Sequence, residues 1–528
     1  MTRQFDPASL EILWTRLISM VDEAAATLVR TSFSNIVREC HDYAVVLLDA
    51  DGRLLAQSTQ SIPSFISTLP ATVRHVAAKF PVEAMAPGDA FITNDPWLGT
   101  GHLPDINIVV PVFRGGTLVA FSASVAHSPD IGGRIRSPGI RELYEEGLRI
   151  PPLRLFSRGE PERAVLEILE ANVRVPEQVL GDLFAQLAAN RMLEQRLDEL
   201  LDESALDLRA FGREIQGRAE AAMRRAIEAL PDGSHSFVVE VDGFGDPVRI
   251  VCRVTIAGDG IEVDYAGTSP ELKRAINVVP AYTFAYTAYA LKCVLSPGVP
   301  NNDGSFRPFT VKAEEGSILN PRFPAPVGAR AMTGHLLPPA ILGALAEIVP
   351  DRVQAAPGSP LWSCHLTGED GGRRFAYQVF LNGGQGASAG SDGYPTVSFP
   401  SNLGNTPIEV LEAQAPVRVH RREIRRGSGG AGLHRGGDGQ VMEIELLADR
   451  PATVAFMANR LSVPAPGLAG GGAGATGEVL RNGEPFDPRE ISLLEPGDRL
   501  LLATPGGGGF GAAPAHGAPG DETRGTGR

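Results

Sequence analysis

The chain has 528 residues, of which 43% are hydrophobic and 21% are charged, and its formal net charge is −14 at pH 7. This length allows two to four domains with sizeable cores, and the composition is that of an ordinary globular protein. The negative balance argues against nucleic acid and anionic membrane surfaces as partners, because nothing would offset the repulsion from phosphate groups.

The four cysteines, Cys40, Cys252, Cys293 and Cys364, form no CxxC pair and have no regular spacing. This usage excludes a disulfide scaffold and a thiolate zinc knuckle, and it suits a reducing compartment. No apolar run reaches membrane-spanning length, and the N-terminus lacks a basic segment followed by an apolar one. We therefore expect a cytoplasmic protein.

Residues 1–160 are predicted to combine one long helix with β-hairpins. Asp6-Pro7 is typical of a helix start, and apolar residues at helical spacing extend that helix to about Ser32. Apolar runs at 42–48 and 53–56 flank an Asp- and Gly-containing turn and predict the first hairpin.

Residues 161–230 are predicted to be helical. A stretch rich in alanine, leucine, glutamate and arginine runs from Pro176 to Leu230 and keeps a helical period, with a break near 202–204. We expect these helices to pack on each other or on the N-terminal sheet.

Residues 231–511 are predicted to be β-rich, with helices near 280–295 and 336–348. Sixty glycines and 42 prolines punctuate the chain and crowd after residue 380, which predicts strands joined by glycine-rich turns. We expect 512–528 to be a disordered tail. The predicted fold class is α+β, a β-rich multidomain architecture with a long helical insert and a glycine-rich β C-terminal region.

A second predicted hairpin carries the most informative cluster of side chains. Two apolar runs between residues 106 and 126 are separated by Gly115-Gly116, a signal for a tight turn. His102 and Asp105 lie just before the first run, and His127 follows the second. Folding the hairpin returns His127 to the end where the other two enter. Two imidazoles and a carboxylate are ligands that zinc, manganese or iron accept.

The register of this hairpin decides whether the cluster forms. With Gly115-Gly116 as a regular two-residue turn, Asp105 pairs with Ala126 and lies on the opposite face from His127. A three-residue turn, or one bulge, shifts the pairing by one residue and places both side chains on one face. The pattern permits the metal cluster without requiring it, and histidines that make ordinary hydrogen bonds are the alternative.

Three glycine-rich motifs lack the context that their chemistry needs. Residues 472–477 match GxGxxG, but strand and turn signals follow, so no helix N-terminus would meet a pyrophosphate. Residues 386–390 match GxSxG, yet the following 391–395 cannot open the helix of a nucleophile elbow. Residues 504–510 lack the Lys-Ser/Thr of a P-loop, and we expect a flexible or partner-contacting loop there.

Several short segments are specific when they occur together in one order. They are Asn94-Asp95-Pro96 with Gly101-His102 and Pro104-Asp105, Ala126-His127 with Asp130-Ile131-Gly132-Gly133, Glu145-Glu146-Gly147-Leu148, Gly181-Asp182-Leu183, Gly267-Thr268-Ser269, Asn405-Thr406-Pro407-Ile408-Glu409-Val410, Ser428-Gly429-Gly430-Ala431-Gly432, and Thr504-Pro505 with its glycine run. In this order they resemble the hydantoinase B/oxoprolinase family over residues 6–511. That family is related to a subunit of the acetone and acetophenone carboxylases.

The resemblance implies a divalent metal site, which falls on His102, Asp105 and His127 of this sequence. It implies Asp42, in the matching N-terminal segment, as a further ligand. It also implies an A-type partner subunit that binds ATP and phosphorylates a cyclic amide, such as a hydantoin, N-methylhydantoin, 5-oxoproline or a similar lactam. The B subunit then completes hydrolysis at its metal. The phosphate-binding segment of the A half is not found in this chain. We therefore expect the chain to be active only in a hetero-oligomer with its partner subunit.

Three further residues become catalytic candidates through the resemblance. Arg134 and Arg136 follow His127 and are expected either to hold the anionic intermediate or to be solvated loop arginines. Glu146 is expected to act as a general acid or base, with helix capping or a salt bridge as the alternative.

Two other functions fit the same ligand set. The chain could be a subunit of an ATP-dependent ketone carboxylase, because an activated oxygen-bearing intermediate beside a divalent cation serves that reaction as well. It could also be a non-catalytic scaffold in which the metal merely fastens the hairpin.

Overall fold

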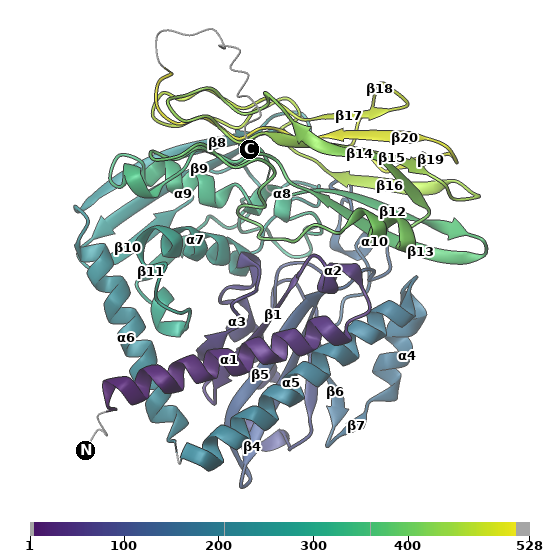
Figure 1. Cartoon of the computed structure of the whole chain (residues 1–528). Coiled ribbons are helices and arrows are strands. Elements are labelled where there is room, and N and C mark those ends of the chain that lie inside the picture. The colour runs from purple at the N-terminus through teal and green to yellow at the C-terminus, as the bar shows by residue number, and fades with distance from the viewer. Residues whose placement is uncertain (1–4, 205, 360, 514–528) are drawn as a thin grey trace, which may run out of the picture.

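A computed structural model describes residues 5–204, 206–359 and 361–513 of the chain. Its first part is built on a seven-stranded antiparallel sheet with the strand order β2-β1-β5-β4-β3-β6-β7 (Figure 1). The strands are β1 (Tyr43–Asp49), β2 (Leu54–Gln57), β3 (Ala90–Thr93), β4 (Asp105–Arg114), β5 (Thr117–His127), β6 (Leu153–Ser157) and β7 (Glu160–Pro161).

Helices cover both faces of this sheet, so its central strands are buried on both sides and read as continuous apolar runs. The helices of this part are α1 (Pro7–Thr31), α2 (Asn35–Arg38), α3 (Thr68–Lys79), α4 (Arg163–Asn172), α5 (Pro176–Ser204) and α6 (Leu208–Glu228). Figure 1 shows α1 and α5 side by side across one face. Val45 and Leu47 of β1 point toward them, whereas Val46 and Leu48 point into the main core.

The helix predictions for this part agree with the structure. The Asp6 side chain accepts a hydrogen bond from the Ser9 amide, 3.0 Å long, and Pro7 opens α1 as an N-capped first turn should. The predicted break near 202–204 separates α5 from α6, and the Asp207 side chain caps the second of these helices.

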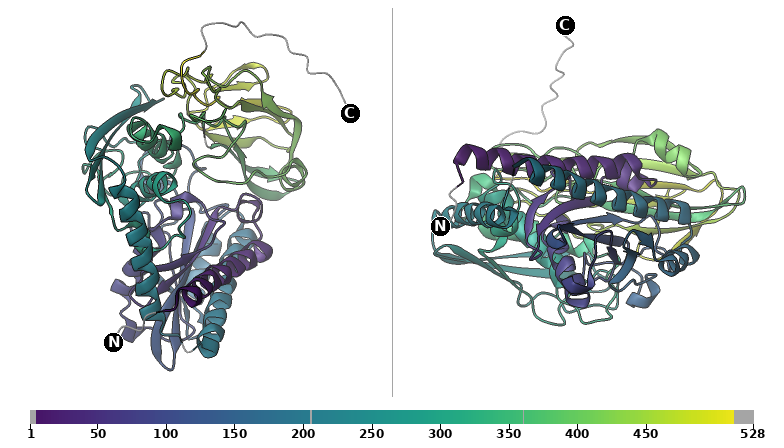
Figure 2. Two further views of the ribbon diagram at one scale, coloured as in Figure 1. Left: turned by 60° about the vertical axis from the view of Figure 1, so that its left-hand side comes forward. Right: turned by 90° about the horizontal axis from the view of Figure 1, so that it is seen from below.

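The middle part of the chain adds a four-stranded sheet in the order β11-β10-β9-β8, with two helices packed on it. Its elements are β8 (Gly233–Val241), β9 (Val248–Ala257), β10 (Gly260–Asp264), α7 (Pro280–Leu295), β11 (Phe309–Lys312), α8 (Ala331–Gly334) and α9 (Leu337–Leu345). This core is continuous with the interior face of the seven-stranded sheet, so the two parts are packed together. Figure 2 shows this part beside the N-terminal part.

The last part consists of two antiparallel sheets, in the orders β13-β12-β16-β19 and β14-β15-β20-β17-β18, which enclose a separate core. The elements are β12 (Trp362–Asp370), β13 (Arg373–Leu381), α10 (Ile408–Gln414), β14 (Val417–Arg425), β15 (Gly439–Leu446), β16 (Ala452–Met457), β17 (Glu478–Arg481), β18 (Glu484–Pro485), β19 (Ser492–Leu494) and β20 (Arg499–Ala503). The mixed helical and β architecture therefore agrees with the predicted fold class. Of the predicted tail, residues 514–528 lie outside the described residues.

The segment 504–510 is buried, which corrects the expectation of a flexible or partner-contacting loop. It runs among other glycine-rich segments, and its backbone exchanges hydrogen bonds with theirs: the Gly507 amide donates to Gly437, and the Gly509 amide to Gly472. A Cβ built on Gly507 would lie 2.1 Å from the Gln385 carbonyl oxygen. The glycines permit a backbone-to-backbone approach that any side chain would block.

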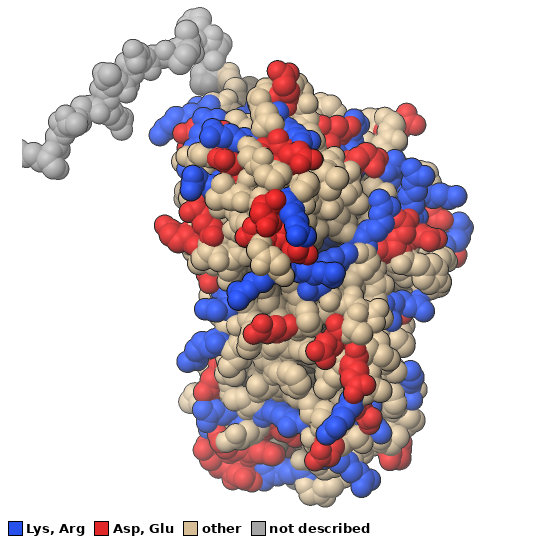
Figure 3. All heavy atoms as spheres, turned by 90° about the vertical axis from the view of Figure 1, so that its right-hand side faces the viewer, with Lys and Arg blue, Asp and Glu red and all other residues tan. Residues whose placement is uncertain are grey.

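The surface carries both signs of charge. On the face drawn in Figure 3, acidic and basic side chains are interspersed over the whole outline. Among the described residues, no helix is both long and apolar enough to cross a membrane.

Candidate metal centre

A β-bulge sets the register that the site needs. Gly115 and Gly116 form a two-residue turn, both with positive φ, and Arg114 pairs with Thr117. The pairing then shifts between Val112 and Phe113, so Val119 is the extra residue of β5. Beyond this point Asp105 pairs directly with His127, and both side chains lie on one face of the sheet. The one-bulge alternative of the sequence is the one observed.

His102 completes a compact triad with Asp105 and His127. One potential ligand atom from each lies within 4.8 Å of the others, and all three residues are buried. His102 Nε2 lies 2.7 Å and His127 Nδ1 3.0 Å from the same oxygen, Asp105 Oδ1. Two ring nitrogens and one carboxylate oxygen therefore converge on a single point, as the ligands of a metal ion do.

The hydrogen bonding of His102 fits a bound cation. Its Nδ1 lies 3.1 Å from the Gly328 carbonyl oxygen and must donate there, a contact that is typical of metal-ligating histidines. Burial and the nearby Arg330 charge hold the pKa of His102 well below its ordinary value, so the ring is neutral and Nε2 keeps a lone pair. Burial alone would raise the pKa of Asp105, but the charge of the Arg330 guanidinium beside it helps to hold that pKa well below its ordinary range. Two acceptors 2.7 Å apart need a cation between them.

Asp42 faces the same point from the neighbouring strand. It directly precedes β1, and the His127 amide donates to its carbonyl oxygen at 3.0 Å. Its side chain is buried, burial raises its pKa to about 6, and its Oδ1 has no hydrogen-bond partner among the described residues. An orphaned buried carboxylate oxygen is costly unless a cation satisfies it, so Asp42 fits as a fourth ligand. It lies outside the compact triad itself.

The four residues line a cavity of about 30 Å³, which is enough space for a water molecule. This space accepts an ion or a water molecule but not an organic ring. An adjoining cavity of about 60 Å³ shares His127 and Arg136 with it and extends to Glu146.

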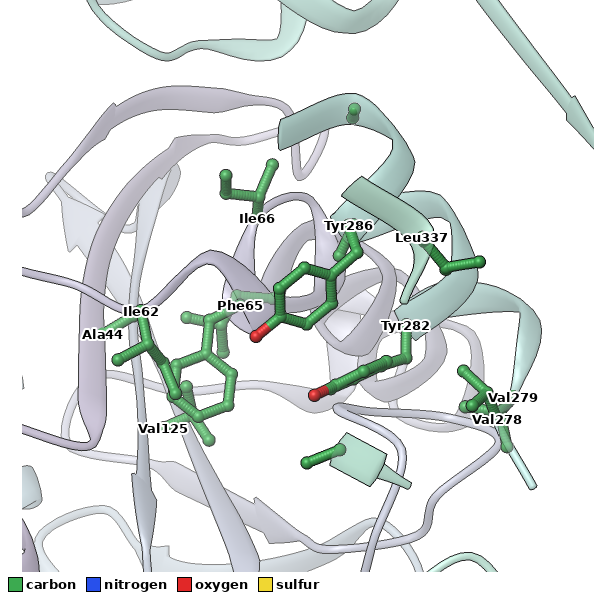
Figure 4. Packing of buried hydrophobic residues seen from close by; sticks show 14 of the residues in the cluster. Ala44, Ile62, Phe65, Ile66, Val125, Val278, Val279, Tyr282, Tyr286 and Leu337 are labelled. Atoms are coloured by element: carbon green, nitrogen blue, oxygen red, sulfur yellow. The ribbon is translucent and has the colours of Figure 1, made fainter. Parts of the chain in front are cut away.

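The middle of the chain supplies cavity walls that the sequence did not reveal. Arg330 donates through Nη2 to Asp105 Oδ2 at 2.6 Å, which leaves Oδ1 for the histidines. Tyr282 and Tyr286 of α7 line the cavity, and Figure 4 shows their hydroxyls pointing toward the segment of Ile62 and Phe65. His335 is buried edge-on against Tyr286, with 5.2 Å between the ring centroids.

The two candidate arginines occupy different environments. Arg134 is half exposed and pairs with Glu145, as expected of a solvated loop arginine. Arg136 donates through Nε to the Gly328 carbonyl at 2.8 Å and through Nη1 to His127 Nε2 at 3.2 Å. Burial lowers its pKa to about 10, which leaves it charged at neutral pH.

Glu146 is buried and holds the backbone that orients His102. Its Oε1 accepts hydrogen bonds from the amides of Val327 and Gly328, at 2.5 and 2.7 Å. Its Oε2 has no partner among the described residues, and burial raises its pKa to about 8 in spite of the two amides. The Glu146 backbone caps the short 3-10 helix Leu143–Glu145, since its amide donates to the Leu143 carbonyl at 3.0 Å. Its side chain forms no salt bridge among the described residues.

Comparisons with known proteins identify the family to which the chain belongs. A protein of Pseudomonas sp. strain NS671, provisionally named as the B subunit of a D-/L-hydantoinase, is 31% identical over 96% of this chain and 90% of its own length. The crystal structure of an ATP-dependent caprolactamase from Pseudomonas jessenii superposes with a TM-score of 0.89 at 29% identity, covering 97% of this chain and 93% of that one. A nucleotide-free acetone carboxylase shares the fold, with a TM-score of 0.88 at 20% identity over 96% of this chain and 76% of that one. The model of the hydantoinase B/oxoprolinase family matches residues 6–513, and the chain belongs to this family.

Proposed function

We propose that this chain is the metal-bearing B subunit of an ATP-dependent cyclic-amide hydrolase. It acts on a hydantoin, 5-oxoproline or a similar lactam together with an A-type subunit that binds ATP. The observation that carries the proposal is the buried pair His102 Nε2 and Asp105 Oδ1, 2.7 Å apart, in a chain that matches the family over residues 6–513. We also propose a cytoplasmic location, because the four cysteines are free and suit a reducing compartment.

In this proposal His102, Asp105, His127 and Asp42 hold a divalent zinc, manganese or iron ion. When bound, such an ion acts as a Lewis acid and lowers the pKa of a coordinated water molecule. The chain's own residues fix the ligands in advance: Arg330 holds Asp105, and the Gly328 carbonyl holds the His102 ring. Because the cavity is small and its ligands are buried, bulk water is kept from the ion site.

The test is co-purification with the A-type subunit, followed by a screen for ATP hydrolysis over lactams, hydantoins and ketones. We expect ring opening coupled to ATP without bicarbonate. His127→Ala should lose bound metal and more than about 100-fold in turnover, since a metal ligand is removed. His420→Ala, a partly exposed histidine that pairs with Glu445, is the matched control and should retain both.

Two results would contradict the proposal. A requirement for bicarbonate in the reconstituted complex would identify a ketone carboxylase. Full turnover of His127→Ala after metal loss would identify a scaffold whose metal only fastens the hairpin.

A further inference from the structure

Arg136 stands between the metal cavity and the cavity beside it. Its guanidinium lines both, and His127 is the other side chain that they share among the ligands. The adjoining cavity has apolar walls from Ile131, Ile135 and Ile140, and it ends at Glu146. The contact of Arg136 with His127 therefore lies where the two cavities meet.

That contact fixes the tautomer of His127. A guanidinium carries donors only, so His127 Nε2 must accept the hydrogen bond from Arg136 Nη1, 3.2 Å away. The ring proton therefore lies on Nδ1, which donates to Asp105 Oδ1 at 3.0 Å. In this state the nitrogen that faces the triad has no free lone pair.

A metal ion at the triad needs the opposite tautomer. His127 Nδ1 can bind a cation only through its lone pair, and the ring proton must then lie on Nε2. Two donors would face each other across 3.2 Å, and the guanidinium charge would add repulsion from the ion. The metal ion and the Arg136 Nη1 hydrogen bond therefore exclude each other.

We propose that metal binding at His127 releases Arg136 into the adjoining cavity, where it forms the site for an anionic group, a phosphate or a carboxylate. The cavity of about 60 Å³ has room for a group of that size. This inference rests on the metal ligands of the proposed function and deepens it, because the released arginine would meet a phosphorylated intermediate.

The other charged groups around this cavity are already paired. Arg134 binds Glu145, and Arg174 donates through Nη1 to Asp130 at 2.6 Å. Arg136 has no carboxylate partner among the described residues. Burial raises the pKa of Glu146 to about 8, so its carboxyl is protonated at neutral pH. The Oε2 hydroxyl can then donate a hydrogen bond to an anion. Arg136 and Glu146 thus offer donors from two sides.

The sign of one measured change tests the inference. In the full-length protein, Arg136→Met should bind Zn²⁺ at least about tenfold more tightly than the native chain in a chelator competition, because the competing hydrogen bond is gone. If Arg136 instead orients His127 as an outer-shell partner, the same variant should bind Zn²⁺ 10- to 100-fold more weakly. Arg134→Met, from the same loop, is the matched control and should change the affinity less than twofold.

A second measurement follows the anion. Inorganic phosphate should bind the Zn²⁺-loaded native chain at least about tenfold more tightly than Zn²⁺-loaded Arg136→Met, by titration calorimetry. Equal phosphate affinity in the two proteins would contradict the anion site, because phosphate would then bind to the metal ion without Arg136. If Arg136→Met does not fold, Arg136→Gln, which retains a donor for Gly328, replaces it with the same expectations. None of these titrations uses ATP or a lactam, so failure of the proposed function would be seen separately.

Discussion

At the scale of single residues, Asp105 organises the site. One oxygen of its carboxylate faces both histidines and the other accepts from Arg330, so both oxygens have polar partners. His102 in turn depends on the Gly328 carbonyl, and Glu146 holds the amide of that same residue. A positioning role therefore accounts for Glu146 better than the acid/base role expected from the resemblance.

The pKa of Glu146 predicts a pH-dependent stability. Because burial raises this pKa to about 8 from an ordinary value of 4.5, the folded state binds more protons than the unfolded state between these values. The stabilisation is complete below about pH 4.5 and is lost as the pH rises to 8. Glu146→Gln should remove this loss and gain about 2 kcal/mol or more over the native chain between pH 5 and pH 8 in denaturant unfolding.

Glu145→Gln is the matched control for that experiment. A hydrogen bond from Arg134 lowers the pKa of Glu145, so any stability it adds is lost only as the pH falls below its ordinary range. Its variant should keep the native slope between pH 5 and pH 8. An unchanged slope in Glu146→Gln would show that the Glu146 carboxyl is ionised in the folded state.

The candidate triad could be predicted because its members lie within one hairpin and its approach. His102, Asp105 and His127 are joined by local strand pairing, which sequence patterns report. Arg330 and Tyr282 lie more than 150 positions after His127 in the chain. Tertiary packing brings them to the site, and no local sequence pattern predicts that packing. Arg136 and Arg134, two positions apart, read alike in sequence, and only the packed structure separates the partly buried one from the exposed one.

At the scale of elements, the β4–β5 hairpin explains why the sequence alone allowed two strand registers. Turn residues Gly115 and Gly116 identify the turn, but a bulge has no composition of its own when the extra residue is an ordinary valine. The helices were more predictable, since apolar residues at a period of 3.6 over the length of α1 do not fit a strand or a turn.

The bulge predicts which deletion the hairpin tolerates. Removing Val119 leaves Val112 paired with Ala120 and Phe113 paired with Leu118, so Asp105 still faces His127. This deletion should retain bound metal and lower the free energy of unfolding by no more than about 2 kcal/mol. Removing Ala123, on the same strand but beyond the bulge, shifts His127 to the other face and should abolish metal binding. Metal content and thermal unfolding measure both, and loss of metal in the Val119 deletion would contradict this register.

At the scale of the whole molecule, the site is a junction of three regions. Asp42 and the hairpin come from the N-terminal part, Tyr282 and Arg330 from the middle, and Phe380 from the last part. A ligand that binds here contacts elements from along most of the chain.

This junction predicts that metal stabilises the entire fold. Zn²⁺ at about 100 times its dissociation constant should add about 3 kcal/mol, seen as a rise in the temperature of a single unfolding transition. A chelator should reverse the rise. His127→Ala should show no metal-dependent shift, and an equal shift in that variant would place the binding site elsewhere.

The close backbone contacts of the segment 504–510 predict that an added side chain is strongly destabilising there. Gly507→Ala places a Cβ 2.1 Å from the Gln385 carbonyl oxygen and should lower the free energy of unfolding by more than about 3 kcal/mol. Gly390→Ala has no atom within 4 Å of its Cβ and should stay within about 1 kcal/mol of the native chain. Equal effects of the two substitutions in denaturant unfolding would contradict this packing.

The burial of 504–510 shows that a glycine-rich composition does not by itself indicate a flexible segment. A run of four glycines after Thr504-Pro505 has no hydrophobic pattern, and by composition it belongs with flexible linkers. Here the run has little spatial freedom, because neighbouring carbonyl oxygens occupy the positions that side chains would take. Its amides should therefore rank among the slowest to exchange with solvent deuterium. A low-complexity sequence can thus form a closely packed part of the protein interior.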